Sequence, residues 1–423
     1  MNSRERVEAA LSHREPDRVP LDLGGSAVTG MHVSTVYVLR QSLELDPPST
    51  PVKVVEPFQM LGEIAPDLQD ALGIDVVGLG LRDNMFGFEN SGWKSWTLFD
   101  ETPVLVPGSF NTDVEPDGSV VQYPRGDKSS EPCVRMPRDG FYFDAIDRQD
   151  PIDWADLDPE DNLEEFGPIA DDELRYLENE AKRLYGTGKA IFANFGGTSF
   201  GDIALVPGMQ LRDPKGIRGV KEWYMCSVRR PDYMLRVYER QLEIALENLE
   251  KIHGAIGDSV SVAFITGTDF GGQRRPLMSN ASYAKLYKPF HRRINDWVHE
   301  NTEWKTFIHS CGSVEPLINE FIEAGFDILN PVQTTAADMA PGALKEKYGE
   351  KISFWGGGVD TQGTLPFGLP EEVRRQVAER IRILSPGGGF VFNTVHNVQP
   401  RIPVENVQAM YETIRECRSY SNE

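Results

Sequence analysis

The residue types best suited to chemistry lie close together near position 310. His309 and Cys311 are two positions apart, and side chains at i and i+2 of an extended strand point to the same face. An imidazole nitrogen and a thiolate sulfur both bind zinc, at about 2.0–2.3 Å. The pair therefore predicts a metal site, with His396, after a later apolar run, as the candidate third ligand. Three protein ligands and one open position are typical of a catalytic zinc site.

Other interpretations of these residues stay open at this point. Cysteines are often buried only for packing, and a histidine at a strand end is often only hydrogen-bonded. Asp269 precedes Gly271 and Gly272. It is either a catalytic or substrate-binding carboxylate, or an Asx cap of the turn that these glycines form.

Short apolar runs that alternate with amphipathic helical patterns must position these residues. An open doubly wound sheet gives the same alternation, but eight runs favour an α/β fold of the (β/α)8 TIM-barrel type. The runs cover residues 19–23, 75–79, 190–195, 260–265, 304–309, 327–330, 352–355 and 390–395. Helical patterns are predicted at 231–254, 280–300, 314–325, 341–349, 370–384 and 404–418.

One segment interrupts this alternation. Residues from about 84 to 170 are rich in Asp, Pro and Gly with scattered aromatic residues, which predicts an acidic, partly β insertion after the second strand. We therefore expect one domain over residues 1–423 that carries this insertion. Because active sites of such barrels lie at the carboxyl ends of the strands, Asp269, His309, Cys311 and His396 are expected to lie near one another.

Composition limits the partners and the compartment. The formal net charge is −22, which argues against nucleic acid or an anionic membrane as the main partner. No apolar stretch approaches the roughly 18 residues of a membrane helix, and residues 1–20 lack the apolar core of a signal peptide. The cysteines lie far apart (Cys133, Cys226, Cys311 and Cys417), which fits a reducing cytoplasm better than a disulfide framework.

Several motifs resemble those of the uroporphyrinogen decarboxylase superfamily. They lie at residues 4–11 with 16–20, 269–273 with 276–279, 309–313, 330–333, 355–360 and 396–406. The resemblance covers nearly the whole chain and is weakest in the insertion. It implies a (β/α)8 barrel and one of two chemistries.

The decarboxylase alternative is the less favoured of the two. True uroporphyrinogen decarboxylases hold a polycarboxylate with arginines in an N-terminal motif, and here Pro20 is followed by Leu21-Asp22-Leu23-Gly24-Gly25-Ser26. The other branch consists of methyltransferases that pass a methyl group between a small substrate and a corrinoid protein. Some of these bind zinc through His-x-Cys and a distant Cys. His309 and Cys311 match the pair, but His396 stands where the distant Cys is expected, and Cys417 lies in the final helix.

The resemblance thus implies a corrinoid-dependent methyltransferase, assisted by zinc bound to His309, Cys311 and His396. Asp269, Asn194, Gln333 and Asp360 are its expected substrate-orienting or catalytic residues. The methylated substrate is a methyl ether, thioether or similar molecule, and demethylation transfers its methyl group to the cobalamin-type cofactor. A separate protein carries this corrinoid, because no histidine here stands in an Asp-x-His-x-x-Gly context. A catalytically inert ligand-binding barrel is the non-enzymatic alternative, and a homodimer is one assembly open to such a barrel.

Overall fold

A seven-stranded parallel sheet forms the centre of the protein. The computed structural model describes residues 1–420 of the 423-residue chain. The main sheet has the strand order β15-β14-β13-β12-β11-β10-β3, and it curls as a half-barrel. Its strands, which match seven of the eight predicted runs, are β3 (Val76–Gly80), β10 (Ala190–Asn194), β11 (Val262–Thr266), β12 (Lys305–His309), β13 (Ile328–Asn330), β14 (Ser353–Trp355) and β15 (Phe390–Val391).

The concave side of this sheet is filled by large side chains. Phe192, Phe307 and Trp355 come from three different strands, and their ring centroids lie 4.6–5.8 Å apart. Val7 and Leu11 of helix α1 (Ser3–Leu11) belong to the same buried cluster. The strands are therefore held around a packed core, which is the arrangement typical of barrel enzymes.

The first predicted run, residues 19–23, does not form a strand. Leu21 makes an isolated parallel bridge with Phe392, and the Asp75 amide donates to the Leu21 carbonyl at 2.8 Å. The segment therefore bonds to both edges of the main sheet. Pro20 has no N–H to extend such a ladder, although its carbonyl accepts from the Phe392 amide at 2.8 Å. The expected eight-stranded sheet is thus seen as seven strands and this bridging segment.

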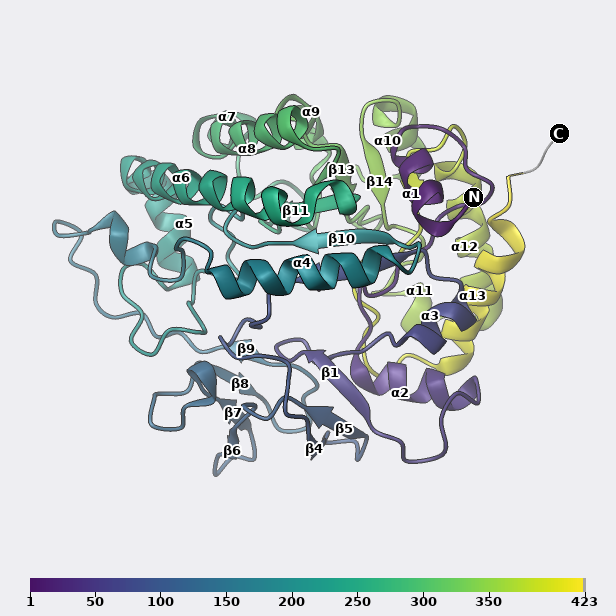
Figure 1. The fold of residues 1–423 in the computed structure, drawn as a ribbon, viewed down its shortest axis with the longest axis horizontal. Coiled ribbons are helices and arrows are strands. Elements are labelled where there is room, and N and C mark those ends of the chain that lie inside the picture. The colour runs from purple at the N-terminus through teal and green to yellow at the C-terminus, as the bar shows by residue number, and fades with distance from the viewer. Residues whose placement is uncertain (421–423) are drawn as a thin grey trace.

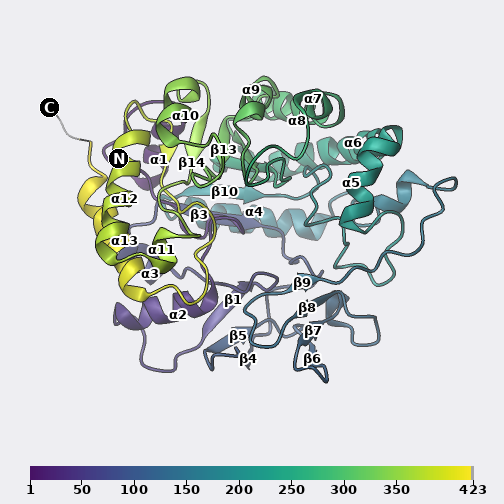
Figure 2. The ribbon, with the colours of Figure 1, turned by 180° about the vertical axis from the view of Figure 1, so that it is seen from behind.

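Helices cover the outside of the sheet (Figures 1 and 2). Neighbouring pairs such as α4 with α6, α6 with α8 and α12 with α13 pack on one another. Besides α1, the helices are α2 (Val33–Ser42), α3 (Pro66–Leu72), α4 (Asp171–Tyr185), α5 (Val220–Arg229), α6 (Pro231–Ile256), α7 (Asn280–Leu286), α8 (Lys288–Asn301), α9 (Ile318–Glu323), α10 (Pro341–Tyr348), α11 (Thr364–Phe367), α12 (Pro370–Leu384) and α13 (Val404–Cys417).

Two small sheets lie below the main sheet in Figure 1. One has the order β2-β1-β5-β4 and the other β6-β7-β8-β9. Their strands are β1 (Val52–Glu56), β2 (Leu61–Gly62), β4 (Lys94–Thr97), β5 (Pro103–Val106), β6 (Thr112–Val114), β7 (Val120–Gln122), β8 (Val134–Met136) and β9 (Asp144–Ala145). Strands β4 to β9 fall within the segment expected as an insertion, whereas β1 and β2 precede it.

The two ends of the described chain lie on the same side of the protein in both views. The Val19 amide donates to the Arg418 carbonyl at 2.7 Å, which ties the first segment to the end of α13. In residues 1–420, none of the helices combines the length and the apolar character that crossing a bilayer requires.

Candidate metal centre

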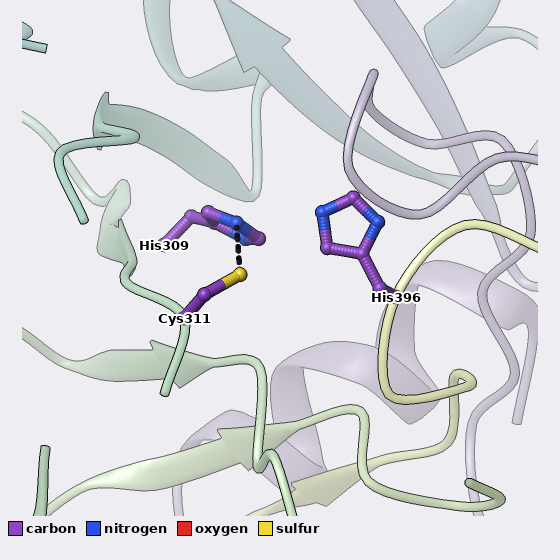
Figure 3. Close-up of side chains that lie close together, drawn as sticks. All are labelled: His309, Cys311 and His396. Atoms are coloured by element: carbon purple, nitrogen blue, oxygen red, sulfur yellow. Dashed lines mark hydrogen bonds between the residues drawn. The ribbon is translucent and has the colours of Figure 1, made fainter. Parts of the chain in front are cut away.

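His309, Cys311 and His396 meet at the carboxyl end of the main sheet. His309 ends β12, Cys311 lies in the loop after it, and His396 lies in the segment after β15. The candidate ligand atoms of the three side chains lie within 4.8 Å of one another. His309 Nε2 is 3.3 Å from Cys311 Sγ, and the two imidazole centroids are 5.3 Å apart. Figure 3 shows the three side chains facing one another.

Asn330 fixes the orientation of the His309 ring. Its Oδ1 lies 2.5 Å from His309 Nδ1, and its amide nitrogen donates to the Trp355 carbonyl at 2.7 Å. This second bond identifies the atom facing His309 as the acceptor, so His309 carries its proton on Nδ1. Nε2 is then the lone-pair atom that faces Cys311. Sequence reasoning noted Asn330 within a motif but did not assign it to the site.

The electrostatics of the three side chains suit a cation. Burial lowers the pKa of His309 to about 4. Burial also lowers the pKa of His396 to about 4, and the neighbouring His309 lowers it further. Burial and the nearby Asp269 carboxylate raise the pKa of the Cys311 thiol. Both imidazoles are therefore neutral ligands, and a bound divalent cation would supply the charge that deprotonates the thiol.

This donor set fits zinc. Two neutral imidazole nitrogens and one sulfur are the borderline ligands that zinc takes, and three protein ligands leave one tetrahedral position for a substrate atom. The Asn330 contact adds the outer hydrogen bond that usually accompanies a metal-binding histidine.

Asp269 lies beside the cysteine rather than capping its own turn. Its Oδ1 accepts the Cys311 amide at 2.7 Å, which joins the loop after β11 to the loop after β12. The two loops are in backbone contact, because a Cβ placed on Gly312 would lie 2.4 Å from the Gly271 carbonyl carbon. Gly312 also has a φ of +88°, so glycine is required at this position.

Of the other three predicted substrate residues, one lies close to the candidate ligands and two make no hydrogen bond to them in the described residues. Gln333 lies close to the site, since its Oε1 accepts the Gly312 amide at 2.6 Å. Asn194 is exposed at the end of β10 and accepts from the Gly196 amide. Both carboxylate oxygens of Asp360 accept amides of its own turn, from residues 362 and 364. In the described residues, neither Asn194 nor Asp360 hydrogen-bonds to the three candidate ligands.

Sequence reasoning missed two further polar groups near Asp269. The Asp269 carboxylate contributes to raising the pKa of both Asp202 and Tyr224, which places these residues within electrostatic reach of it. Asp202 lies in the loop after β10, and Tyr224 lies on α5. The only sequence signal for Asp202 was its place after the third strand in a Gly-rich loop.

Comparison with known proteins identifies a family and a fold that this chain resembles. Residues 209–417 match the family model described as Uroporphyrinogen decarboxylase (URO-D). A uroporphyrinogen decarboxylase of Alkalilimnicola ehrlichii is 28% identical over 75 residues, which are 18% of this chain and 20% of that protein. Over these residues the chain is similar to the uroporphyrinogen decarboxylase family. The aligned segment spans only one fifth of that superfamily member's length.

A solved structure shares its fold with nearly the whole chain. A methyltransferase from Methanosarcina mazei superposes with a TM-score of 0.55 at 16% identity, covering 98% of this chain and 99% of that one. At this identity the superposition shows a shared fold. The family match over residues 209–417 confirms the resemblance that the motifs predicted.

Proposed function

We propose that this protein is a methyltransferase that moves a methyl group between a small methylated substrate and a corrinoid carried by a separate protein. The observation that carries the proposal is the convergence of His309, Cys311 and His396 within 4.8 Å at the carboxyl end of the sheet. The Methanosarcina mazei structure, itself a methyltransferase, adds support from the fold. The substrate is a methyl ether, a thioether or a related molecule.

The chain's own residues hold and orient the reacting atom. His309, Cys311 and His396 would hold zinc, which supplies Lewis acidity to an oxygen or sulfur atom at its open position. Asn330 keeps His309 Nε2 directed at that point, and Asp269 fixes the Cys311 backbone. Gln333 is the predicted residue best placed to orient a substrate, since it contacts the same loop.

The charge of the site favours this reaction over decarboxylation of a polycarboxylate. In the described residues, no arginine or lysine side chain hydrogen-bonds or ion-pairs with Asp269, Asn330, Gln333 or the three candidate ligands. A substrate with several carboxylates would meet the buried Asp269 carboxylate here, to which no cation is bonded in the described residues. We further infer that residues 19–23 complete a (β/α)8 barrel over the whole chain, with residues 84–170 inserted.

Elemental analysis of the purified protein tests the metal first. We expect about one zinc per chain, and loss of zinc in a His309→Ala, Cys311→Ala double variant. Cys417→Ala, which removes a cysteine from α13, is the matched control and should keep its zinc. Wild-type protein should then form methylcob(III)alamin from cob(I)alamin and a methyl ether or thioether. A metal-free wild type would overturn the zinc-assisted reaction.

A further inference from the structure

Asp202 is packed directly against the strand that leads to Asp269. The loop after β10 is bonded to the end of β11, where Thr268 Oγ1 donates to the Phe200 carbonyl at 3.0 Å. A Cβ placed on Gly267 would lie 2.8 Å from Asp202 Oδ2. The carboxyl group of Asp202 therefore reaches the backbone two residues before Asp269.

Asp202 is buried without a cationic partner in the described residues. Asp202 is only 9% exposed. Its Oδ1 accepts the Ala204 amide at 3.0 Å. Burial, with a smaller contribution from the Asp269 carboxylate, raises the pKa of Asp202 to about 6. The group is thus able to exchange a proton near neutral pH.

A small cavity lies on another side of Asp202. Its lining includes Ser199, Asp202, Arg218, Trp223, Tyr238 and Gln241. Trp223 and Tyr238 are 4% and 0% exposed. In the described part of the chain, Trp223 Nε1 and the Tyr238 hydroxyl have no hydrogen-bond partner. Two buried donors and a carboxylate around one cavity are the surroundings that hold ordered water.

Of the two carboxyl groups that line the cavity, Asp202 and Glu165, Asp202 is the one without a cationic partner in the described residues. Arg218 is bonded to Glu165 and Glu164 and stays paired. Burial raises the pKa of Tyr238 and also that of Tyr224, so both phenols keep their protons at neutral pH.

We propose that Asp202 is the proton-relay residue of the methyl-transfer site, and that ordered water in the cavity beside Trp223 and Tyr238 connects it to solvent. The inference rests on the proposed function. In demethylation, the bond between the methyl carbon and its oxygen or sulfur breaks, and the electron pair stays on that heteroatom. The methyl carbon takes a new pair from a cobalt(I) corrinoid. The heteroatom takes a proton from the Asp202 carboxyl group through water, and a proton from solvent, passed along the cavity water, reprotonates Asp202.

The test uses the reverse reaction of the full chain with methylcob(III)alamin and 2-mercaptoethanol, in which the thiol loses a proton. We expect the wild-type rate to rise with pH through about 6, because Asp202 accepts this proton only when it is ionised. Asp202→Asn should be roughly 100-fold slower, lose this limb of the pH profile and keep its zinc. Asp22→Asn removes another buried carboxyl group whose pKa is about 6 and should keep the limb.

Infrared titration separates failure of the relay from failure of the proposed function. A protonated-carboxyl band that titrates near pH 6 should be lost in Asp202→Asn, whether or not the protein transfers methyl groups. If wild type is inactive but this band is present, the proposed methyl transfer fails while the protonation of Asp202 stands. An unchanged rate and pH profile in Asp202→Asn would overturn the relay. Should that variant not fold, Trp223→Phe, which removes one cavity donor, should slow the reaction several-fold, and an unchanged rate would overturn the relay.

Discussion

Asn330 is the side chain on which the orientation of His309 depends. Asn330→Ala leaves the His309 Nδ1–H without its acceptor and frees the ring to rotate, so Nε2 is no longer held toward Cys311. Loss of such an outer hydrogen bond typically weakens metal binding 10–100-fold. We expect that weakening in competition titrations with a zinc chelator. Asn194→Ala, at an exposed strand end, should bind zinc like wild type, and equal affinity of the two variants would show that Asn330 does not orient the ligand.

Asp22 makes the stability of the fold depend on pH. It is 1% exposed, and its Oδ2 accepts the Trp355 indole N–H at 2.9 Å. Burial raises its pKa from 3.8 to about 6. Because the folded protein binds this proton more tightly than the unfolded chain, the stabilisation is present below about pH 4 and is lost as the pH rises to about 6. The difference between the folded and unfolded pKa of Asp22 corresponds to about 3 kcal/mol in the free energy of unfolding.

Urea unfolding of wild type and Asp22→Asn at pH 4.5 and pH 7 measures this contribution. The asparagine variant should gain about 2 kcal/mol of stability relative to wild type between the two pH values, because part of the Asp22 contribution is already lost at pH 4.5. Comparing the two proteins at each pH cancels the effect of the many surface carboxylates. A difference between the proteins that is the same at both pH values would contradict a raised pKa for Asp22.

Spacing in the sequence predicted part of the site, and the remainder depends on tertiary contacts. His309 and Cys311 share a strand end, so their proximity follows from local geometry. His396 is far away in sequence, and only the barrel interpretation placed it near them. Asn330 acts through partners on other strands, and Asp202 approaches the backbone of Gly267 in another loop. No local pattern identifies such contacts. Asp360 was predicted from its motif, but its carboxylate bonds to its own turn.

At the scale of elements, two loops must touch for the site to exist. The loops after β11 and β12 meet at Gly271 and Gly312, where no Cβ fits. Gly312→Ala should separate these loops, pull Asp269 away from Cys311, lower zinc affinity and destabilise the fold by about 1–3 kcal/mol. Gly342→Ala, where a Cβ on α10 meets nothing within 4 Å, should change stability by less than about 1 kcal/mol. Zinc titration and urea unfolding of both variants provide the test, and tight zinc binding by Gly312→Ala would contradict it.

The periodicity of the sequence predicted most helices and strands. It did not predict where a proline or a hydrogen bond to a neighbouring loop ends one of them early. The pattern at 280–300 predicts one helix, yet the structure has α7 and α8 with a break at Tyr287. Pro289 follows shortly after this break, and its missing N–H and its ring disfavour a continuous helix. The eighth run was predicted over 390–395 but its strand ends at Val391. Beyond it, the Asn393 carbonyl accepts from the Gly358 amide of a neighbouring loop.

At the scale of the whole molecule, specific contacts tie the acidic segment to the rest of the protein. From Asp144 to Arg175 there are 13 acidic and 2 basic residues, so electrostatic repulsion opposes packing of this segment. Arg148 offsets this repulsion. Its guanidinium group donates to four backbone carbonyls in residues 207–212 at 2.8–3.3 Å. Beside it, Gln149 Oε1 accepts the Arg218 and Gly219 amides. These contacts hold the loop that connects Asp202 to α5.

Arg148→Ala should therefore loosen that loop without unfolding the main sheet. Hydrogen exchange measured by mass spectrometry should become faster in residues 203–219 and in α5, because the four carbonyls lose their shared donor and the loop opens more often. Exchange in β12 should stay as slow as in wild type, since its hydrogen bonds go to β11 and β13. Arg138→Ala changes an arginine of the same insertion that is 73% exposed at its side chain, and it should exchange like wild type throughout. Faster exchange in β12 as well would mean that Arg148 supports the whole fold, and unchanged exchange in 203–219 would mean that other contacts hold the loop.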